Sequence, residues 1–241
     1  MNIDQTEIAA YLQGISLFTR LSQAERVSLA NKARLMTKKP NQILVHEGDT
    51  LSYIYILRQG KGLCYFLHPD GKKTIIYHIR QDKPFAVETA LTGTRHNGII
   101  EIVEDAIVLA IPVDRVTKLM HTDAAFASQV AYHTMDCALR LTDLLKDLSF
   151  GAPARLGRYL FRRALEAGEP YGEGVCFDLG MRKGVLADFL GITPETLSRM
   201  FSQLQNEEVI TVKRSKITVN NIKNLVHLSE GFCQEQQGNA D

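Results

Sequence analysis

The chain has 241 residues, which is enough for two domains that each bury a core of their own. With 28 Lys+Arg and 27 Asp+Glu the formal net charge is +1, so any nucleic-acid partner has to be recognised by local clusters of charge. The composition, 45% hydrophobic and 23% charged, excludes bulk disorder, and no uncharged run approaches the roughly 18 residues of a membrane-spanning helix.

The start of the chain and the cysteine spacing bear on location and cofactors. The first residues, M-N-I-D-Q-T-E, lack the basic and then apolar layout of an export signal, so we expect a cytoplasmic protein without a membrane partner. The four cysteines, Cys64, Cys137, Cys176 and Cys233, are too widely spaced for a C-x-x-C metal clip or a disulfide framework. We therefore expect reduced cysteines and no metal site.

The first 112 residues predict short helices followed by an all-β block. Residues 5–36 have the apolar spacing and the start signals of short helices, and Ser22 and Glu25 have the spacing of a capping box. From residue 42 to residue 113 short runs rich in β-branched and aromatic residues alternate with Gly-Asp and Pro-Asp-Gly turns about every ten residues. This pattern is typical of a compact β-sandwich or barrel.

Residues 113–150 return to a helical pattern with an a/d seam. The seam repeats with spacings of four and three and predicts a partner helix in a dimer; it consists of Val130, Thr134, Cys137, Leu141, Leu144 and Leu148. The other face, with Met135, Ala138 and Leu145, is suited to covering the β-block. The alternative is a helix that lies across the β-block and has no partner.

Gly151 and Pro153 interrupt this helix and place a domain boundary there. We expect a sensor domain in residues 1–112, a dimerisation helix and hinge in residues 113–150, and a second domain in residues 151–228. The remaining residues, 229–241, are polar and Gln-rich and predict a flexible tail.

The second domain contains a helix-turn-helix pattern. A helix from Arg182 to Leu190 ends at Gly191, and Thr193 then caps a second helix whose first residue is Pro194. The positions that the pattern leaves exposed on that second helix are Glu195, Thr196, Ser198, Arg199, Ser202 and Gln203, and the candidate base readers among them are Glu195, Ser198 and Arg199. Glutamate accepts from cytosine N4 and arginine binds guanine O6 and N7, so we expect these residues to read base pairs in the major groove.

Further residues are placed for contact with the DNA backbone. The segment I-T-V-K-R-S-K-I-T-V, residues 210–219, predicts a two-stranded wing with basic residues at its tip. The expected backbone contacts, in the wing and around the two helices, are Arg182, Lys183, Thr193, Thr196, Lys213, Arg214 and Lys216. A helix-turn-helix that serves only packing is the competing interpretation.

On these residues the chain resembles the CRP/FNR transcription regulators, over residues from about 10 to 228. The E-T-L-S-R stretch at Glu195 to Arg199 is similar to the E-x-x-S-R recognition pattern of the FNR and DNR-like branches, which read TTGA-type half-sites. The resemblance implies an α+β chain: an N-terminal double-stranded β-roll of the cyclic-nucleotide-binding kind, a long dimerisation helix and a C-terminal winged helix-turn-helix. It also implies a homodimer on palindromic double-stranded DNA, with RNA polymerase as a further partner.

The resemblance implies an effector in the β-roll, and the sequence disfavours cyclic AMP. The cyclic-nucleotide branch has a Gly-Glu pair, but Val87 precedes Glu88 here. That branch also binds the cyclic phosphate through Arg-Ser or Arg-Thr; this chain has His96 followed by asparagine, or Arg95-His96 one residue out of register. On the long helix, Arg140 lies near the level where that branch carries Thr-Ser.

The histidines and cysteines indicate which other effectors the β-roll could bind. No cysteine precedes Cys64, which excludes the N-terminal iron-sulfur cluster of the oxygen-sensing branch. DNR-like regulators respond to nitric oxide through haem, and they share F-A-x-E and the proline before E-T-x-S-R. Among the histidines, His78 is the first candidate axial ligand, because Ile76 and Phe85 would make its pocket apolar. A small metabolite or no ligand is the alternative, and a lone strand histidine is more often structural.

Two other classes of function compete with a transcription regulator. An enzyme would have to use Glu88, His96, Asp105 and His133, but no nucleophile-base order, metal spacing or P-loop is visible. A ligand-binding or scaffolding module that no longer binds DNA has the same sequence pattern. The effect of replacing Arg199 on DNA binding separates it from a regulator.

Overall fold

The computed structural model describes residues 4–71, 73–168, 174–179 and 181–230, and the side chain of Leu148 lies outside what it describes. Cys233 and all but the first two residues of the expected tail also lie outside these ranges. The chain divides into two compact units, residues 1–141 and 142–241, so the division falls inside one long helix. Each unit is described by itself.

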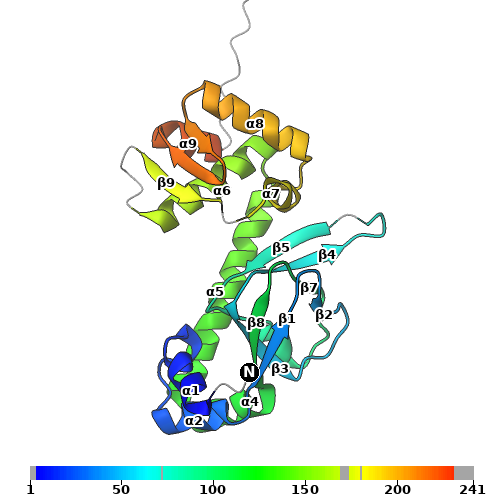
Figure 1. Ribbon diagram of the computed structural model, residues 1–241, viewed down its shortest axis with the longest axis vertical. Coiled ribbons are helices and arrows are strands. Elements are labelled where there is room, and N and C mark those ends of the chain that lie inside the picture. The colour runs from blue at the N-terminus through cyan, green and yellow to red at the C-terminus, as the bar shows by residue number, and fades with distance from the viewer. Residues whose placement is uncertain (1–3, 72, 169–173, 180, 231–241) are drawn as a thin grey trace, which may run out of the picture. The chain divides into compact units, whose positions relative to one another are not determined.

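The N-terminal unit is a β-roll preceded by short helices (Figure 1). The helices come first: α1 (Gln5–Gln13), the 3-10 turn η1 (Ser16–Phe18) and α2 (Gln23–Ala30). The strands are β1 (Arg34–Lys38), β2 (Ile43–Val45), β3 (Tyr53–Gln59), β4 (Gly62–Leu67), β5 (Lys73–Ile79), β6 (Pro84–Phe85), β7 (Ile99–Ile102) and β8 (Ala106–Pro112). The short helix α3 (Val87–Thr92) follows β6, and α4 (Val113–Thr122) and α5 (Ala124–Leu148) complete the set.

The strands form two four-stranded antiparallel sheets. Their orders are β1-β8-β3-β6 and β2-β7-β4-β5. Apolar residues of these strands such as Ile56, Ile100 and Val108 are fully buried and make the core. Gly60 joins β3 to β4 at φ +95°, where a Cβ would come within 2.5 Å of the Asp105 carbonyl oxygen. The expected β-roll is confirmed.

The helical region after residue 112 is two helices where the sequence suggested one. Asp123 separates α4 from α5, and its carboxylate accepts hydrogen bonds from the backbone N–H groups of Ala125 (2.8 Å) and Phe126 (3.1 Å). This side-chain cap starts a new helix direction. The capping box at α2 is present as expected: the Glu25 carboxylate accepts from the Ser22 N–H at 2.8 Å.

The predicted dimer seam on α5 needs correction at one position, Val130. Val130 is only 2% exposed and packs in the core of its own unit, and Cys137 is half-buried near α3. The large exposed apolar side chains of the helix include Tyr132, Met135, Leu139 and Leu145, all at least 60% exposed. Val130 is therefore covered by its own unit, whereas Leu141 of the same predicted seam is 49% exposed and the side with Met135 and Leu145 is open.

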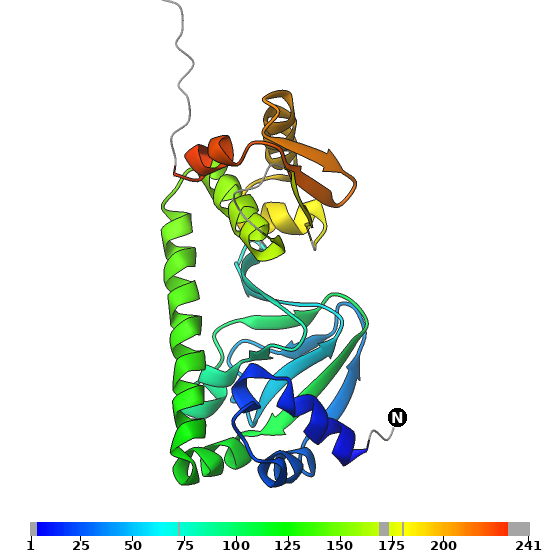
Figure 2. The same cartoon turned by 90° about the vertical axis from the view of Figure 1, so that its left-hand side faces the viewer.

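The C-terminal unit is a winged helix. It contains α6 (Ala152–Ala167), β9 (Val175–Asp178), α7 (Lys183–Leu190), α8 (Pro194–Asn206), β10 (Ile210–Lys213), β11 (Lys216–Val219) and α9 (Ile222–Ser229). The strands form one antiparallel sheet of order β10-β11-β9. Leu186, Leu197, Phe201 and Ile217 are buried in a core of their own. Figure 2 shows the helices and strands of this unit from a second side.

A buried ion cluster ties the end of α5 to α6. Asp147 is 6% exposed and accepts hydrogen bonds from Arg158 Nε and, at 2.6 Å, from Arg162 Nη2. Beside it, Arg155 donates to the carbonyl oxygens of Phe150 (2.7 Å) and Leu190 (2.9 Å). These bonds hold the short connection before α6 against the winged helix.

We expect Asp147→Asn to destabilise the chain, because it removes a charge that two guanidinium groups share in a buried setting. The free energy of unfolding should fall by about 2 kcal/mol, measured by urea denaturation of the C-terminal transition. The matched control is Asp143→Asn, an exposed aspartate one turn earlier on the same helix, with an expected effect within about 0.5 kcal/mol. Equal effects of the two variants would contradict the assigned role of Asp147.

Candidate DNA-binding interface and effector site

The two helices α7 and α8 meet at a turn that their sequence dictates. Gly191 adopts the left-handed conformation, φ +63°, and ends α7. The Thr193 hydroxyl accepts the Thr196 N–H at 3.2 Å and caps α8, and Pro194 is the first residue of that helix. The turn therefore fixes where α8 begins and which side chains stand in its first turns.

The expected base readers share one exposed face of α8. Glu195, Ser198 and Arg199 are exposed, and their spacing of three and four residues places them side by side on the helix. The backbone N–H of Glu195, the Thr193 hydroxyl and the charge of Arg199 together lower the pKa of the Glu195 carboxyl. Glu195 is then ionised at neutral pH and acts only as a hydrogen-bond acceptor.

The residues expected at the DNA backbone surround this face. Lys213 and Lys216 are paired across the β10–β11 hairpin, and Arg214 occupies its turn in the left-handed region, φ +57°. No ion pair with another described residue involves Lys213, Arg214 or Lys216, and all three side chains are exposed. Their charge is available to phosphates.

The remaining backbone-contact candidates lie near the turn between the helices. Arg182 is the N-cap residue of α7 and is exposed, and Lys183 begins the helix with its ammonium group 5.2 Å from the centre of the Phe201 ring. Thr193 is exposed and Thr196 is half-buried, with its hydroxyl 3.4 Å from a guanidinium nitrogen of Arg199. That contact positions Arg199 on its helix face.

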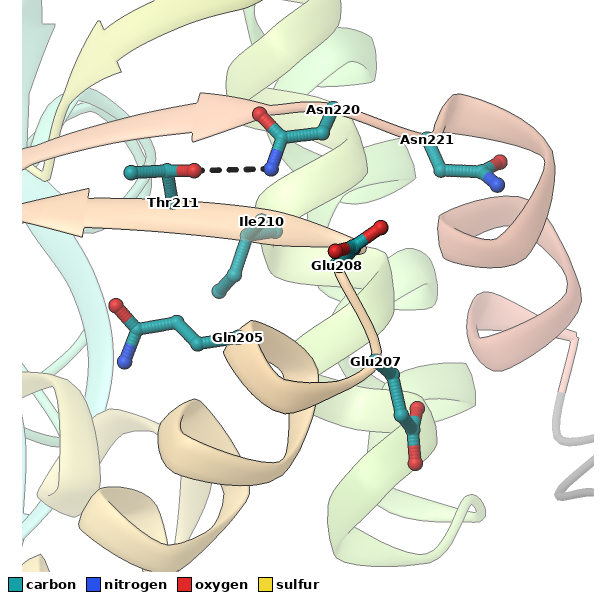
Figure 3. Close-up of a pocket in the computed structure, with 7 residues that line it drawn as sticks. All are labelled: Gln205, Glu207, Glu208, Ile210, Thr211, Asn220 and Asn221. Atoms are coloured by element: carbon teal, nitrogen blue, oxygen red, sulfur yellow. Dashed lines mark hydrogen bonds between the residues drawn. The ribbon is translucent and has the colours of Figure 1, made fainter.

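A polar pocket lies at the other end of α8. Figure 3 shows its lining residues, among them Gln205, Glu207 and Glu208, with Asn220 donating a hydrogen bond to the Thr211 hydroxyl at 2.9 Å. Two carboxylates in this pocket repel phosphate groups. We therefore do not assign it to the DNA interface.

The expected effector residues are spread over both sheets and two helices. His78 is half-buried on β5, whereas Phe85 is buried on β6 in the other sheet and stacks on Tyr55, with ring centres 5.6 Å apart. Arg95 is exposed and donates to the Gly48 carbonyl oxygen at 3.3 Å. Arg140 is exposed on α5 and pairs with Asp136.

Two of the expected residues lie close together beside α3. His96 is 5% exposed, and its Nδ1 lies 3.2 Å from the hydroxyl oxygen of Thr89 in α3. Burial lowers the pKa of His96, and the carboxylate of Glu88, which is also in α3, opposes that shift. Glu88 in turn meets His133 and Cys137 of α5, with one ligand atom from each residue within 4.8 Å of the others. This group of three was not predicted from the sequence, although His133 and Cys137 have the H-x-x-x-C spacing that places two ligands on one helix face.

The buried His96 makes stability depend on pH. Burial lowers the pKa of His96 below its ordinary value of about 6.5, although Asp49 and Glu88 oppose the shift. As pH falls through about 6.5 the unfolded chain therefore takes up a proton that the folded chain does not, and the free energy of unfolding falls. We expect His96→Asn to flatten this decline between pH 7 and 5.

Urea denaturation at a series of pH values measures the effect. His121→Asn is the control, because His121 is exposed at the end of α4. The assignment fails if His121→Asn flattens the profile as much as His96→Asn does.

Comparison with known protein families covers both units. Residues 35–123 match the family described as cyclic nucleotide-binding domain, and residues 154–228 match the family described as Crp-like helix-turn-helix domain. None of the described helices is long and apolar enough to span a membrane.

The proteins with similar sequences include several that are named as regulatory proteins. The regulatory protein HlyX of Actinobacillus pleuropneumoniae is 26% identical over 216 residues, which is 85% of this chain and 86% of HlyX. The fumarate and nitrate reduction regulatory protein of Vibrio cholerae is 26% identical over 205 residues, 83% of this chain and 81% of the relative.

Solved structures share the fold. FixK2 from Bradyrhizobium japonicum has a TM-score of 0.71 at 22% identity, covering 81% of this chain and 96% of FixK2. A CooA variant from Carboxydothermus hydrogenoformans has a TM-score of 0.73 at 17% identity, covering 87% of this chain and 91% of CooA. At these identities the likeness concerns the fold.

The fold and these matches define a transcription regulator with an effector-binding β-roll and a winged helix-turn-helix. The two domain families occur in one chain and in the same order as the resemblance implied, and the curated relatives extend over both. The chain belongs to the CRP/FNR family.

Proposed function

We propose that this chain is a homodimeric regulator that binds palindromic DNA with TTGA-like half-sites. The observation that carries this proposal is the exposed set Glu195, Ser198 and Arg199 on the first turns of a capped helix. Arg199 binds guanine through two N–H donors, Glu195 accepts from a cytosine amino group, and Ser198 donates or accepts. Lys213, Arg214 and Lys216 of the wing contact phosphates and set the register.

The second copy of the chain docks on the open face of α5. Met135, Ala138 and Leu145 are separated by three and seven residues, which is the spacing of a coiled-coil seam, and Tyr132 and Leu139 flank them. Covering these large apolar side chains with the same face of another copy removes them from water. A two-fold axis along α5 then presents two recognition helices to half-sites about one helical turn apart.

The effector acts by shifting the population between two dimer arrangements, and it changes DNA binding only as far as it prefers one of them. Cyclic AMP is disfavoured for this role. Val87 is fully buried where the nucleotide-binding pattern has glycine, and Arg95 is exposed and donates to a backbone carbonyl. Haem held by His78 stays a prediction, and an absorption spectrum with and without nitric oxide tests it.

Selection from a pool of randomised duplexes tests the DNA-binding proposal. The full chain should enrich a palindrome whose half-sites contain TTGA-like steps, at a spacing of about one turn. A chain that is dimeric but enriches no sequence would instead support a scaffolding or ligand-binding module that has lost DNA binding. We further propose that the regulator works in the cytoplasm with RNA polymerase as its partner, and that no catalytic step is involved.

A further inference from the structure

Three potential metal ligands converge between the β-roll and the long helix. Glu88 belongs to α3, and His133 and Cys137 lie four residues apart on α5, so one face of α5 presents both. One ligand atom of each residue lies within 4.8 Å of the other two, and Cys137 Sγ is 3.8 Å from His133 Nε2. All three side chains are half-buried.

This cluster is not satisfied by the protein alone. Glu88 Oε1 is buried and has no hydrogen-bond partner among the residues that the structure describes. A buried carboxylate oxygen without a partner costs free energy, and a cation offsets that cost. Burial also raises the pKa of the Cys137 thiol to about 12 and lowers the pKa of His133. A bound cation would reverse the shift of the thiol.

We propose that Glu88, His133 and Cys137 bind a divalent transition-metal ion of the zinc class. The three donors are a carboxylate oxygen, an imidazole nitrogen and a thiolate sulfur, which are the ligands that Zn²⁺ takes at roughly 2.0–2.3 Å. Tetrahedral coordination at these lengths needs ligand atoms roughly 3.5 Å apart, so small side-chain rotations suffice. The thiolate and the imidazole disfavour Mg²⁺ and Ca²⁺, which take oxygen ligands.

Three protein ligands leave one coordination position open. In zinc proteins an open position holds water or an exogenous ligand, whereas sites closed by four protein ligands are structural. The site therefore has room for a small donor molecule in addition to the metal. Binding requires Cys137 to lose its proton, so metal uptake releases protons and weakens as the pH falls.

The site joins two elements that matter to the proposed regulator. The metal would fasten α5, which carries the open apolar face with Met135 and Leu145, to α3 of the β-roll. This consequence rests on the proposed function; metal binding itself does not. Occupancy would favour the dimer arrangement in which α3 and α5 are in contact.

Titration of the purified, chelator-treated full chain with Zn²⁺ and Co²⁺ tests the site. We expect one ion per chain, proton release on binding, and a sulfur-to-cobalt charge-transfer band with intense tetrahedral d–d bands for Co²⁺. Cys137→Ser should abolish the charge-transfer band, and Glu88→Gln, which keeps the side-chain shape, should weaken Zn²⁺ binding by at least roughly tenfold.

The matched control is Cys176→Ser, at an exposed free cysteine of the C-terminal unit, which should leave both readouts unchanged. Thermal unfolding of each metal-free variant shows whether it is folded. The inference is overturned if the wild-type chain binds no Zn²⁺ in the micromolar range, or if Cys137→Ser and Glu88→Gln, both folded, bind metal as the wild type does. A wild-type chain that selects its palindrome but binds no metal overturns the metal site alone, and one that binds metal but selects no DNA overturns the regulator alone.

Discussion

Replacing Arg199 by alanine is expected to weaken binding to the cognate palindrome by about 1–3 kcal/mol per half-site and to relax the preference at one base pair. The reason is the loss of a bidentate contact with guanine from an exposed guanidinium on the first turns of α8. Fluorescence anisotropy with the selected duplex, and with each single-base variant at the guanine position, measures both effects.

Arg214→Ala provides the matched control, because it removes the same charge from the tip of the wing. It should lower affinity by a similar factor on every sequence and reduce the salt slope by about one unit, since it neutralises a phosphate without reading a base. Arg199→Lys should resemble Arg199→Ala, because an ammonium group lacks the planar fork. If Arg199→Ala weakens all duplexes equally, the role of Arg199 in base reading is wrong.

Introducing a charge into the open face of α5 should separate the subunits. With Met135→Glu, two introduced carboxylates would face each other across the two-fold axis in a desolvated interface, at a cost of about 3 kcal/mol or more. We expect sedimentation to show monomers at concentrations where the wild type is dimeric. Affinity for the palindrome should then fall to that of a single half-site.

The control for this experiment is Leu67→Glu. Leu67 is 47% exposed at the end of β4, so the same chemical change there lies away from α5. A dimer that withstands Met135→Glu but dissociates with Leu141→Glu would place the interface on the seam suggested by the sequence, because Leu141 is the 49% exposed residue of that seam. Loss of dimers with Leu67→Glu would place the interface on the β-roll.

Much of the fold could be predicted from sequence patterns that extend over a few residues. The capping box at Ser22, the left-handed Gly191 and the cap at Thr193 all appear in the structure as expected, because each depends on residues within a few positions of one another. The same short range allowed the exposed positions Glu195, Ser198 and Arg199 to be placed on one helix face. Their contacts with bases stay a prediction.

The structure after residue 112 was harder to predict from the sequence. A helical period continues on both sides of Asp123, so the sequence suggested one helix, and the side-chain cap that divides α4 from α5 was missed. The pairing of strands in the wing sheet is a similar case. Residues 210–219 indicate the hairpin, but the pairing of β9 with β11 joins Val175 to Val219, and such long-range register is not encoded in local propensity.

By itself the sequence determined the two kinds of domain, the capped helix-turn-helix and the residues on its outer face, because turns, caps and periodicity act over a few residues. Only the tertiary structure decided which side of α5 meets the β-roll, since both sides are apolar enough to be buried and docking alone buries Val130 and leaves Met135 open. It also decided that Glu88 meets His133 and Cys137. These residues come from elements far apart in the chain, and no local rule relates one element to the other.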